Sequence, residues 1–224
     1  MNRLHHPRMR RRIVATLTGG LTLLVLGTIA PFTAQAAINC TSANTMSGQN
    51  GAAINVAGGQ TKCLVGLTQT GAVTVDPDGT LAVRGSKITG AVFLNSGFSE
   101  FEFCGSSTVG GAISANGGKG PVTIGNTGLL GIGLLACDPN TVGGAVVLNG
   151  NLSSVTLARN EIKEAVTASG NTGGTKIAGN HIVGALKCTT NAPPPNNFGL
   201  LNTVPMRNTV GGARTGQTCL SGSF

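Results

Sequence analysis

The sequence repeats itself about every 20 residues. The string TVGGA occurs at residues 108–112, 141–145 and 209–213, and degenerate copies fill most of the sequence between them. Aligning the copies on their alanine gives seven anchor positions: Ala72, Ala91, Ala112, Ala145, Ala165, Ala185 and Ala213. The anchors are 19, 21, 33, 20, 20 and 28 residues apart, which is a period near 20 with two insertions. Such a period is typical of a solenoid, in which one short unit stacks on the next.

Within each unit, apolar and polar residues alternate as in a β-strand with one buried face. A β-branched residue stands three positions before the anchor in six units: Ile88, Val109, Val142, Ile162, Ile182 and Val210. A second alternating segment follows about ten residues after the anchor, as at Phe101 and Phe103 or Val155 and Leu157. Each turn therefore contains at least two strands. The residue just before the anchor is glycine in six of the seven units, which we interpret as a buried narrow point where a Cβ would not fit.

These patterns predict an all-β protein, a right-handed parallel β-helix (β-solenoid) of about seven 20-residue rungs with disulfide-stapled ends. One turn alone buries too few apolar side chains to offset the entropy of ordering its chain, so the turns must stack. A leucine-rich repeat shares the period, but its L-x-x-L-x-L core is absent. A five-residue repeat begins at Val142 and fails at Thr167 and Thr172, which argues against a pentapeptide-repeat helix.

Asn and Ser recur at two places in the unit. They stand five residues before the anchor at Ser86, Ser107, Asn140, Asn160, Asn180 and Asn208, and four residues after it at Asn95, Asn116, Asn149 and Ser169. Both residue types tolerate turns and bond to nearby backbone. We predict that Asn140, Asn160, Asn180 and Asn208 stack as a hydrogen-bonded ladder. The alternative is a turn preference without a ladder.

The first 36 residues have the composition of an export signal. Five arginines precede an apolar stretch at residues 13–30, and Ala34-Gln35-Ala36 is a small-x-small cleavage motif. We predict that residues 1–36 are removed and that residues 37–224 form a single β-helix domain, with no membrane span left after cleavage. A retained membrane anchor is the alternative. Sec and twin-arginine export both remain open.

Removal of this segment changes the charge of the chain. Residues 37–224 hold ten Lys and Arg against seven Asp and Glu, so the net charge falls from +8 to +3. They contain no basic run, and the chain has neither Tyr nor Trp. A nucleic-acid partner is therefore not expected, because binding would need a basic stripe with aromatic side chains.

Six cysteines, all after residue 36, are typical of an oxidising compartment. Cys104 and Cys137 each stand eight residues before an anchor, so they occupy the same place in successive units, and we predict that they form a disulfide. By proximity, Cys40–Cys63 and Cys188–Cys219 would close the two ends, although other pairings of the end cysteines remain open. Export and cysteine content together predict a secreted or cell-surface (extracellular) protein.

Two insertions interrupt the period, near residues 126–137 and 191–200. The first contains the apolar stretch 127–136, which is either a loop folded over the rod or an exposed patch for a partner. The second contains Pro193, Pro194 and Pro195, which favour a stiff extended loop, and we interpret it as a rigid spacer before the last rung.

Candidate catalytic residues are sparse. His181 is the one histidine after residue 36, and we place it on the outer face without a catalytic role. No two acidic residues share a position in the repeat, and Asp76 and Asp78 belong to a D-P-D-G turn. Glu100 and Glu102 point the same way on one strand, which we interpret as a solvated face rather than a carboxylate pair. The sequence therefore predicts no catalytic, cofactor-binding or metal-binding residue.

Residues 179–188 read GNHIVGALKC, and after the proline loop residues 207–219 read RNTVGGARTGQTC. This pattern resembles the C-terminal signature of small uncharacterised exported proteins of actinobacteria, G-N-x-V-x-G-x-L-x-C … P-x-P … N-x-V-x-G … G-Q-C. Thr218, between Gln217 and Cys219, departs from it. The match covers residues 179–219, and the remainder matches only as repeats. The resemblance implies pairing of Cys188 with Cys219 and implies no activity.

Two functional hypotheses follow from these features. The first is an exported structural, surface-associated or binding protein without catalysis, whose partner is a cell-wall glycan or a surface protein. The alternative is a carbohydrate-active enzyme or glycan-binding module that uses one face of the β-helix. A groove lined by acidic and aromatic residues would favour the enzyme, and a flat polar face would favour the first hypothesis. The oligomeric state is undecided, and end-to-end self-assembly would need uncapped terminal rungs.

Overall fold

A computed structural model describes residues 38–125, 137, 139–197, 205–222 and 224. The chain divides into two compact units, Met1–Ala34 and Gln35–Phe224, and all the described residues belong to the second. The proposed export signal at 1–36 and the apolar stretch 127–136 lie outside the described residues.

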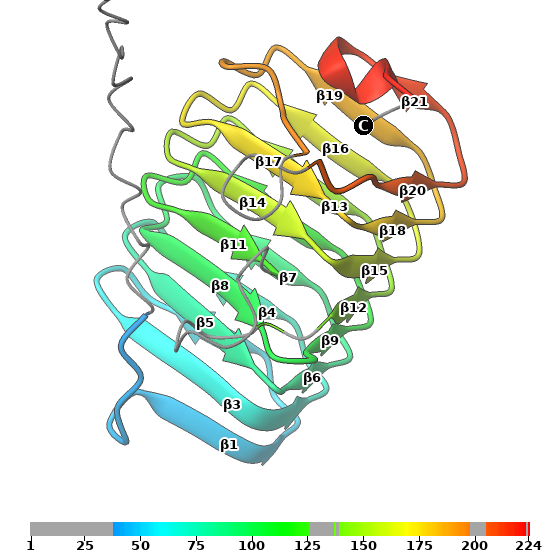
Figure 1. The fold of residues 1–224 in the computed structure, drawn as a ribbon. Helices are drawn as coiled ribbons and strands as arrows, with labels where there is room; N and C mark the ends of the chain where they lie inside the picture. The colour runs from blue at the N-terminus through cyan, green and yellow to red at the C-terminus, as the bar shows by residue number, and fades with distance from the viewer. Residues whose placement is uncertain (1–37, 126–136, 138, 198–204, 223) are drawn as a thin grey trace, which may run out of the picture. The chain divides into compact units, whose positions relative to one another are not determined.

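The second unit is the predicted parallel β-solenoid, with about seven turns wound in the right-handed sense (Figure 1). Each turn contributes strands to three faces. The first face contains β1 (Thr45–Asn50), β3 (Thr61–Gln69), β5 (Thr80–Arg84), β8 (Glu100–Cys104), β11 (Val122–Ile124), β14 (Val155–Ala158) and β17 (Thr175–Ala178). The second contains β6 (Lys87–Ile88), β9 (Thr108–Val109), β12 (Asn140–Val142), β15 (Asn160–Ile162), β18 (His181–Ile182) and β20 (Thr209–Val210). The third contains β2 (Ile54–Val56), β4 (Val73–Val75), β7 (Val92–Leu94), β10 (Ile113–Asn116), β13 (Val146–Asn149), β16 (Val166–Ser169), β19 (Leu186–Thr189) and β21 (Arg214–Thr215).

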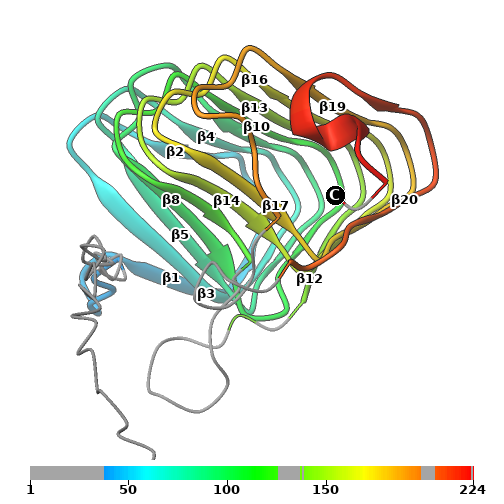
Figure 2. The ribbon, with the colours of Figure 1, turned by 45° about the horizontal axis from the view of Figure 1, so that its top comes forward.

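The strands form two sheets in which every pair is parallel. The nine-residue strand β3 runs across the first and second faces and joins them into one 13-stranded sheet, while the third face is a separate sheet of eight strands. In Figure 2 the successive turns overlie one another around a common core. Neighbouring strands are therefore one whole turn apart in sequence, as a repeat of about 20 residues requires.

The anchor alanines lie in a single row. The carbonyl of Ala145 accepts a hydrogen bond from the amide of Ile113, and that of Ala165 accepts one from Val146, both at 3.0 Å. The same bond, from the residue after one anchor to the next anchor, occurs in all six successive pairs of anchors. Ala72 accepts the equivalent bond from Ile54, the residue after Ala53, so one turn precedes the first recognised anchor. The predicted register is confirmed.

The core is filled by the residues that the alternation assigned to the inner face. Along the first face, Leu64, Val83, Phe103, Ile124, Leu157 and Ile177 occupy one register column, and all are fully buried. Phe98 and Phe101 also belong to the core and are fully buried. Stacking buries each inner side chain between those of the turns before and after it. This burial of apolar surface is the main favourable contribution to the free energy of folding of a chain with short strands.

Glycine precedes the anchor because the neighbouring turn leaves no space for a Cβ. A Cβ on Gly90 would lie 2.8 Å from main-chain atoms of Ala72, and a Cβ on Gly144 would lie 2.7 Å from those of Ala112. The predicted burial was wrong for five of the six glycines, since only Gly144 is buried. The constraint comes from the backbone of the turn before and not from a narrow interior.

The predicted asparagine ladder is present at the corner between the first and second faces. The side-chain amide of Asn140 donates to Asn160 at 3.1 Å, that of Asn160 to Asn180 at 3.0 Å, and that of Asn180 to Asn208 at 2.9 Å. Each of these amides also donates to a main-chain carbonyl, and Ser86 and Ser107 continue the column toward the N-terminus. The four asparagines are at most 3% exposed, so the ladder satisfies polar groups that water does not reach.

A second ladder, absent from the sequence-based prediction, lies at the corner between the third and first faces. Asn151 donates to Asn171 at 2.8 Å, Asn171 to Asn191 at 2.8 Å, and Asn191 to Gln217 at 2.9 Å. These residues stand two positions after the polar residues that the sequence had marked at the same corner. Asn149, one of those marked residues, has a buried side-chain oxygen without a hydrogen-bond partner.

All three predicted disulfides are present. Cys104 and Cys137 are 4.8 Å apart at Cα and link two consecutive turns across the long insertion. Cys40–Cys63 fastens the segment before β1 to the outer surface of the first face, and Cys188–Cys219 holds the C-terminal end. One disulfide therefore lies near each end of the rod and one near its middle.

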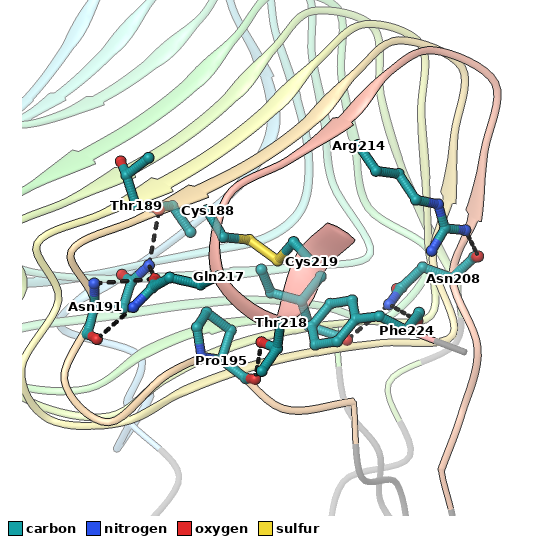
Figure 3. The surroundings of a disulfide bond; sticks show 12 residues. Cys188, Thr189, Asn191, Pro195, Asn208, Arg214, Gln217, Thr218, Cys219 and Phe224 are labelled. Atoms are coloured by element: carbon teal, nitrogen blue, oxygen red, sulfur yellow. Dashed lines mark hydrogen bonds between the residues drawn. A yellow bond between two sulfur atoms is a disulfide. The ribbon is translucent and has the colours of Figure 1, made fainter. Parts of the chain in front are cut away.

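A cap closes the C-terminal end of the solenoid (Figure 3). The 3-10 helix η2 (Gln217–Leu220) brings Cys219 to Cys188, and Cys219 and Phe224 both enter the hydrophobic core. Gln217 ends the second ladder at Asn191, and the main-chain oxygen of Phe224 ends the first by accepting from Asn208 at 2.8 Å. The last rung therefore exposes neither its apolar interior nor the donors of either ladder.

The described part of the proline insertion is not a spacer. Asn196 forms a parallel bridge with Lys176, and its main chain exchanges hydrogen bonds of 2.8 and 3.0 Å with Ile177 and Thr175 of β17. Residues 195–197 therefore add a short strand-like segment to the first face, with Pro195 buried. The interpretation of a rigid spacer was wrong because backbone pairing, and not stiffness alone, positions this loop.

Candidate functional site

A shallow pocket of about 410 Å³ lies at the corner where the chain passes from the first face to the second. Its lining residues are Pro139, Arg159, Asn160, Glu161, Gly179, His181 and Met206. β15 and β18 pair in register, so His181 lies directly beyond Glu161 on the outer surface. His181 is exposed, as predicted. The pocket thus combines an arginine, a carboxylate and a histidine with two apolar walls.

Arg159 adopts a backbone conformation that side chains rarely take. Its φ is 56°, in the left-handed region, where the equivalent corners of other turns carry Gly85 at 57° and Gly179 at 66°. Within the part of the chain that the structure describes, no hydrogen bond or ion pair holds its guanidinium. The corner therefore carries a positive charge that no described group neutralises.

Glu161 is held in its ionised form. A hydrogen bond from Lys163 lowers the pKa of Glu161, and the positive charges of Lys163 and His181 add to the effect. A general acid in glycoside hydrolysis needs the opposite shift, a pKa raised toward neutrality. The pocket therefore holds a carboxyl group whose pKa is lowered, beside the side chains of Arg159 and His181.

Other acidic side chains are neutralised by neighbours in the fold. The guanidinium of Arg84 contacts Glu102 through Nε and Nη2 at 2.7 and 2.8 Å, and Glu102 is only 7% exposed. Interpretation of this strand as a solvated face was therefore wrong for Glu102, because a bidentate ion pair makes its burial tolerable. Asp78 pairs with Lys119 at 2.6 Å, and Asp76 accepts from the amides of Asn55 and Asn95.

The outer surface of the third face carries one long column without acidic residues. In register order it contains Asn55, Thr74, Phe93, Ser114, Val147, Thr167, Lys187 and Thr215. Phe93 is 44% exposed, and the hydroxyl residues on either side of it are small. This column is therefore mostly polar, with Phe93 and Val147 as its two apolar members.

Some of the pocket residues could have been predicted to be neighbours from the sequence, and others could not. Glu161 and His181 both stand four residues before an anchor, so their proximity was implied by the repeat, although it was not used. Arg159 was missed, and its signal was the replacement of the glycine found six residues before other anchors. Met206 follows the segment 198–204 outside the described residues, so its place could not follow from the period.

Comparisons with known proteins place no further constraint on the site. No protein-family model, curated protein or solved structure matches the chain. Among the residues described, no group of three or more His, Cys, Asp or Glu could hold a metal ion. No helix in this same part of the chain is long and apolar enough to cross a membrane.

Replacing Arg159 with glycine should stabilise the protein. Glycine adopts the left-handed conformation without the cost of about 1–2 kcal/mol that a Cβ carries there, and part of this gain is lost to its larger unfolded-state entropy. We expect the free energy of unfolding to rise by about 0.5–1 kcal/mol, measured by chemical denaturation. Arg159→Ala removes the same guanidinium but keeps the Cβ, so it should give no gain. Equal stability of the two variants would show that the backbone at this corner is not strained.

Proposed function

We propose that this chain is an exported, non-catalytic protein that acts outside the cell as a structural or binding rod at the surface. The observation that carries the proposal is that three of the acidic side chains form ion pairs within the fold: Glu102 with Arg84, Glu161 with Lys163 and Asp78 with Lys119. Carboxylates committed to structural ion pairs are poor general acids and nucleophiles.

Export is supported by the three disulfides, which persist in oxidising compartments. Further support comes from the leading 36 residues, which have the composition of a cleavable signal. The C-terminal motif resembling exported actinobacterial proteins is consistent with this assignment, because each of its main positions has a structural task. Asn180 belongs to the ladder, Cys188 to the disulfide, and Gln217 to the cap.

Binding of a cell-wall glycan at the corner pocket is the second candidate function, and Arg159 favours it. The planar guanidinium matches a carboxylate in a bidentate geometry. His181 adds a further donor, and Pro139 and Met206 offer apolar contact for a sugar ring. A glycan carrying carboxylates would therefore meet complementary groups at this corner. Glu161 lies in the same pocket, so it would repel a second carboxylate of the glycan if that carboxylate lay close to the one bound by Arg159.

Co-sedimentation with purified peptidoglycan sacculi tests both candidates. We expect the exported protein to sediment with the sacculi, the Arg159→Ala and Arg159→Gly variants to bind about tenfold more weakly, and binding to fall with added salt. No soluble sugar product should appear in the supernatant. Release of reducing sugar would overturn the non-catalytic assignment. Unchanged binding by both variants would remove the pocket from the interface, and no binding at all would leave the structural role alone.

A further inference from the structure

The two ends of the solenoid are finished differently. At the C-terminal end, η2, Cys219 and Phe224 cover the last rung. At the N-terminal end, β1 pairs only with β3 and β2 pairs only with β4. Each of these two strands therefore has one edge without a strand partner among the residues that the structure describes. Such an edge is a template for further β-pairing.

Residues 38–44, the described part of the segment that precedes β1, do not cover this edge. Ile38 packs against Cys63 and Ala82, and its carbonyl accepts from the Nη2 group of Arg84 at 3.0 Å. Cys40 is bonded to Cys63. These contacts lie on the outer surface of β3 and β5, which are one and two turns inward from β1. The described part of the segment therefore runs along the side of the rod.

The open end carries no charged side chain. Residues 38–61 contain no Asp, Glu, Lys, Arg or His, and β1 reads TMSGQN with Ser47, Gly48 and Gln49 exposed. Edge strands usually carry lysine or proline, which prevent pairing with another chain. An uncharged strand with Asn and Gln side chains favours pairing instead, because side-chain amides can bond across the new contact.

We propose that the N-terminal end is a homodimer interface in which β1 pairs with β1 of a second copy. A two-fold axis brings an edge against itself, and two copies of one strand related in this way are antiparallel. The register of β1 shifts between Met46 and Gly48, so the new ladder is interrupted at this point. At the capped C-terminal end the outermost strands β20 and β21 are only two residues long, and such short edges offer little for a further strand to pair with. Association therefore stops at two copies and does not continue into a filament.

Sedimentation velocity on the exported protein tests this proposal. We expect a monomer–dimer equilibrium for the wild type. In the Ser47→Lys/Gln49→Lys variant the dimer dissociation constant should rise at least ~100-fold, because the added lysines of the two copies would repel one another across the two-fold axis. The matched control, Leu152→Lys/Val183→Lys, adds the same charge at side chains that are 62% and 48% exposed on other surfaces, and it should dimerise as the wild type does.

Hydrogen exchange of the wild type tests the same interface without any substitution, so it still applies if the lysine variant does not fold. The β1 amides should exchange at least ~10-fold more slowly at a protein concentration that favours the dimer than at one that favours the monomer. A wild type that is monomeric at every concentration, a lysine variant as dimeric as the control, or assemblies longer than two copies would each overturn the proposal.

Discussion

Replacing Asn160 with alanine should lower the free energy of unfolding by about 3 kcal/mol, with a fall in Tm of roughly 6–12 °C. Asn160 is 2% exposed and lies in the middle of the first ladder. Its amide donates to Asn180 and to the carbonyls of Ile124 and Ala158 at 2.9–3.0 Å, and its oxygen accepts from Asn140 at 3.1 Å. Alanine leaves several of these buried groups without their partner, and each unsatisfied group costs about 1–3 kcal/mol.

Asn149→Ala is the matched control for this prediction. Asn149 is the same residue type in the same stretch of the rod, but its side-chain oxygen is buried without a hydrogen-bond partner. Its removal should change the free energy of unfolding by less than about 0.5 kcal/mol. Thermal and denaturant unfolding of both variants make the comparison. If Asn160→Ala cost no more than Asn149→Ala, the ladder would be a consequence of the turns and not a source of stability.

Replacing Cys188 and Cys219 together with alanine should both destabilise the protein and change how it associates. The disulfide closes a loop with a sequence separation of 31 residues, and its loss should lower the free energy of unfolding by about 4 kcal/mol. The cap then loosens, and the edges of β20 and β21 become available. With the N-terminal end already paired, a second open end allows association to continue into linear assemblies.

The Cys104/Cys137 double alanine variant separates these two effects. Its disulfide spans 33 residues, so the entropic loss is of similar size, but it lies at the side of the rod and covers neither end. We expect similar destabilisation of both variants, measured by denaturant unfolding, and linear assemblies only in the Cys188/Cys219 variant, measured by light scattering and electron microscopy. Equal association of the two variants would contradict a capping role for the C-terminal disulfide.

The repeat made a large part of this structure predictable. In a solenoid, residues one period apart in sequence are neighbours in space, so equal positions such as Asn160 and Asn180, or Cys104 and Cys137, were expected to touch, and they do. The same reasoning was available for Asn151, Asn171 and Asn191, which are also 20 residues apart. That second ladder was missed because the sequence analysis assigned the corner to the polar residues two positions earlier, including Asn149.

The amino-acid sequence by itself determined the solenoid, its register, the Cys104–Cys137 disulfide and the first ladder, because each depends on contacts between equivalent positions of successive turns. The two end disulfides were expected only from proximity along the chain, and the structure decided their pairing. Only the tertiary structure decided the Arg84–Glu102 ion pair, the corner pocket around Arg159, and the difference between a capped and an open end. Arg84 and Glu102 are not equivalent in the repeat, and the pocket also needs Met206, which follows an irregular segment. The geometry of these features depends on side-chain conformers and on irregular segments, whose path no period specifies.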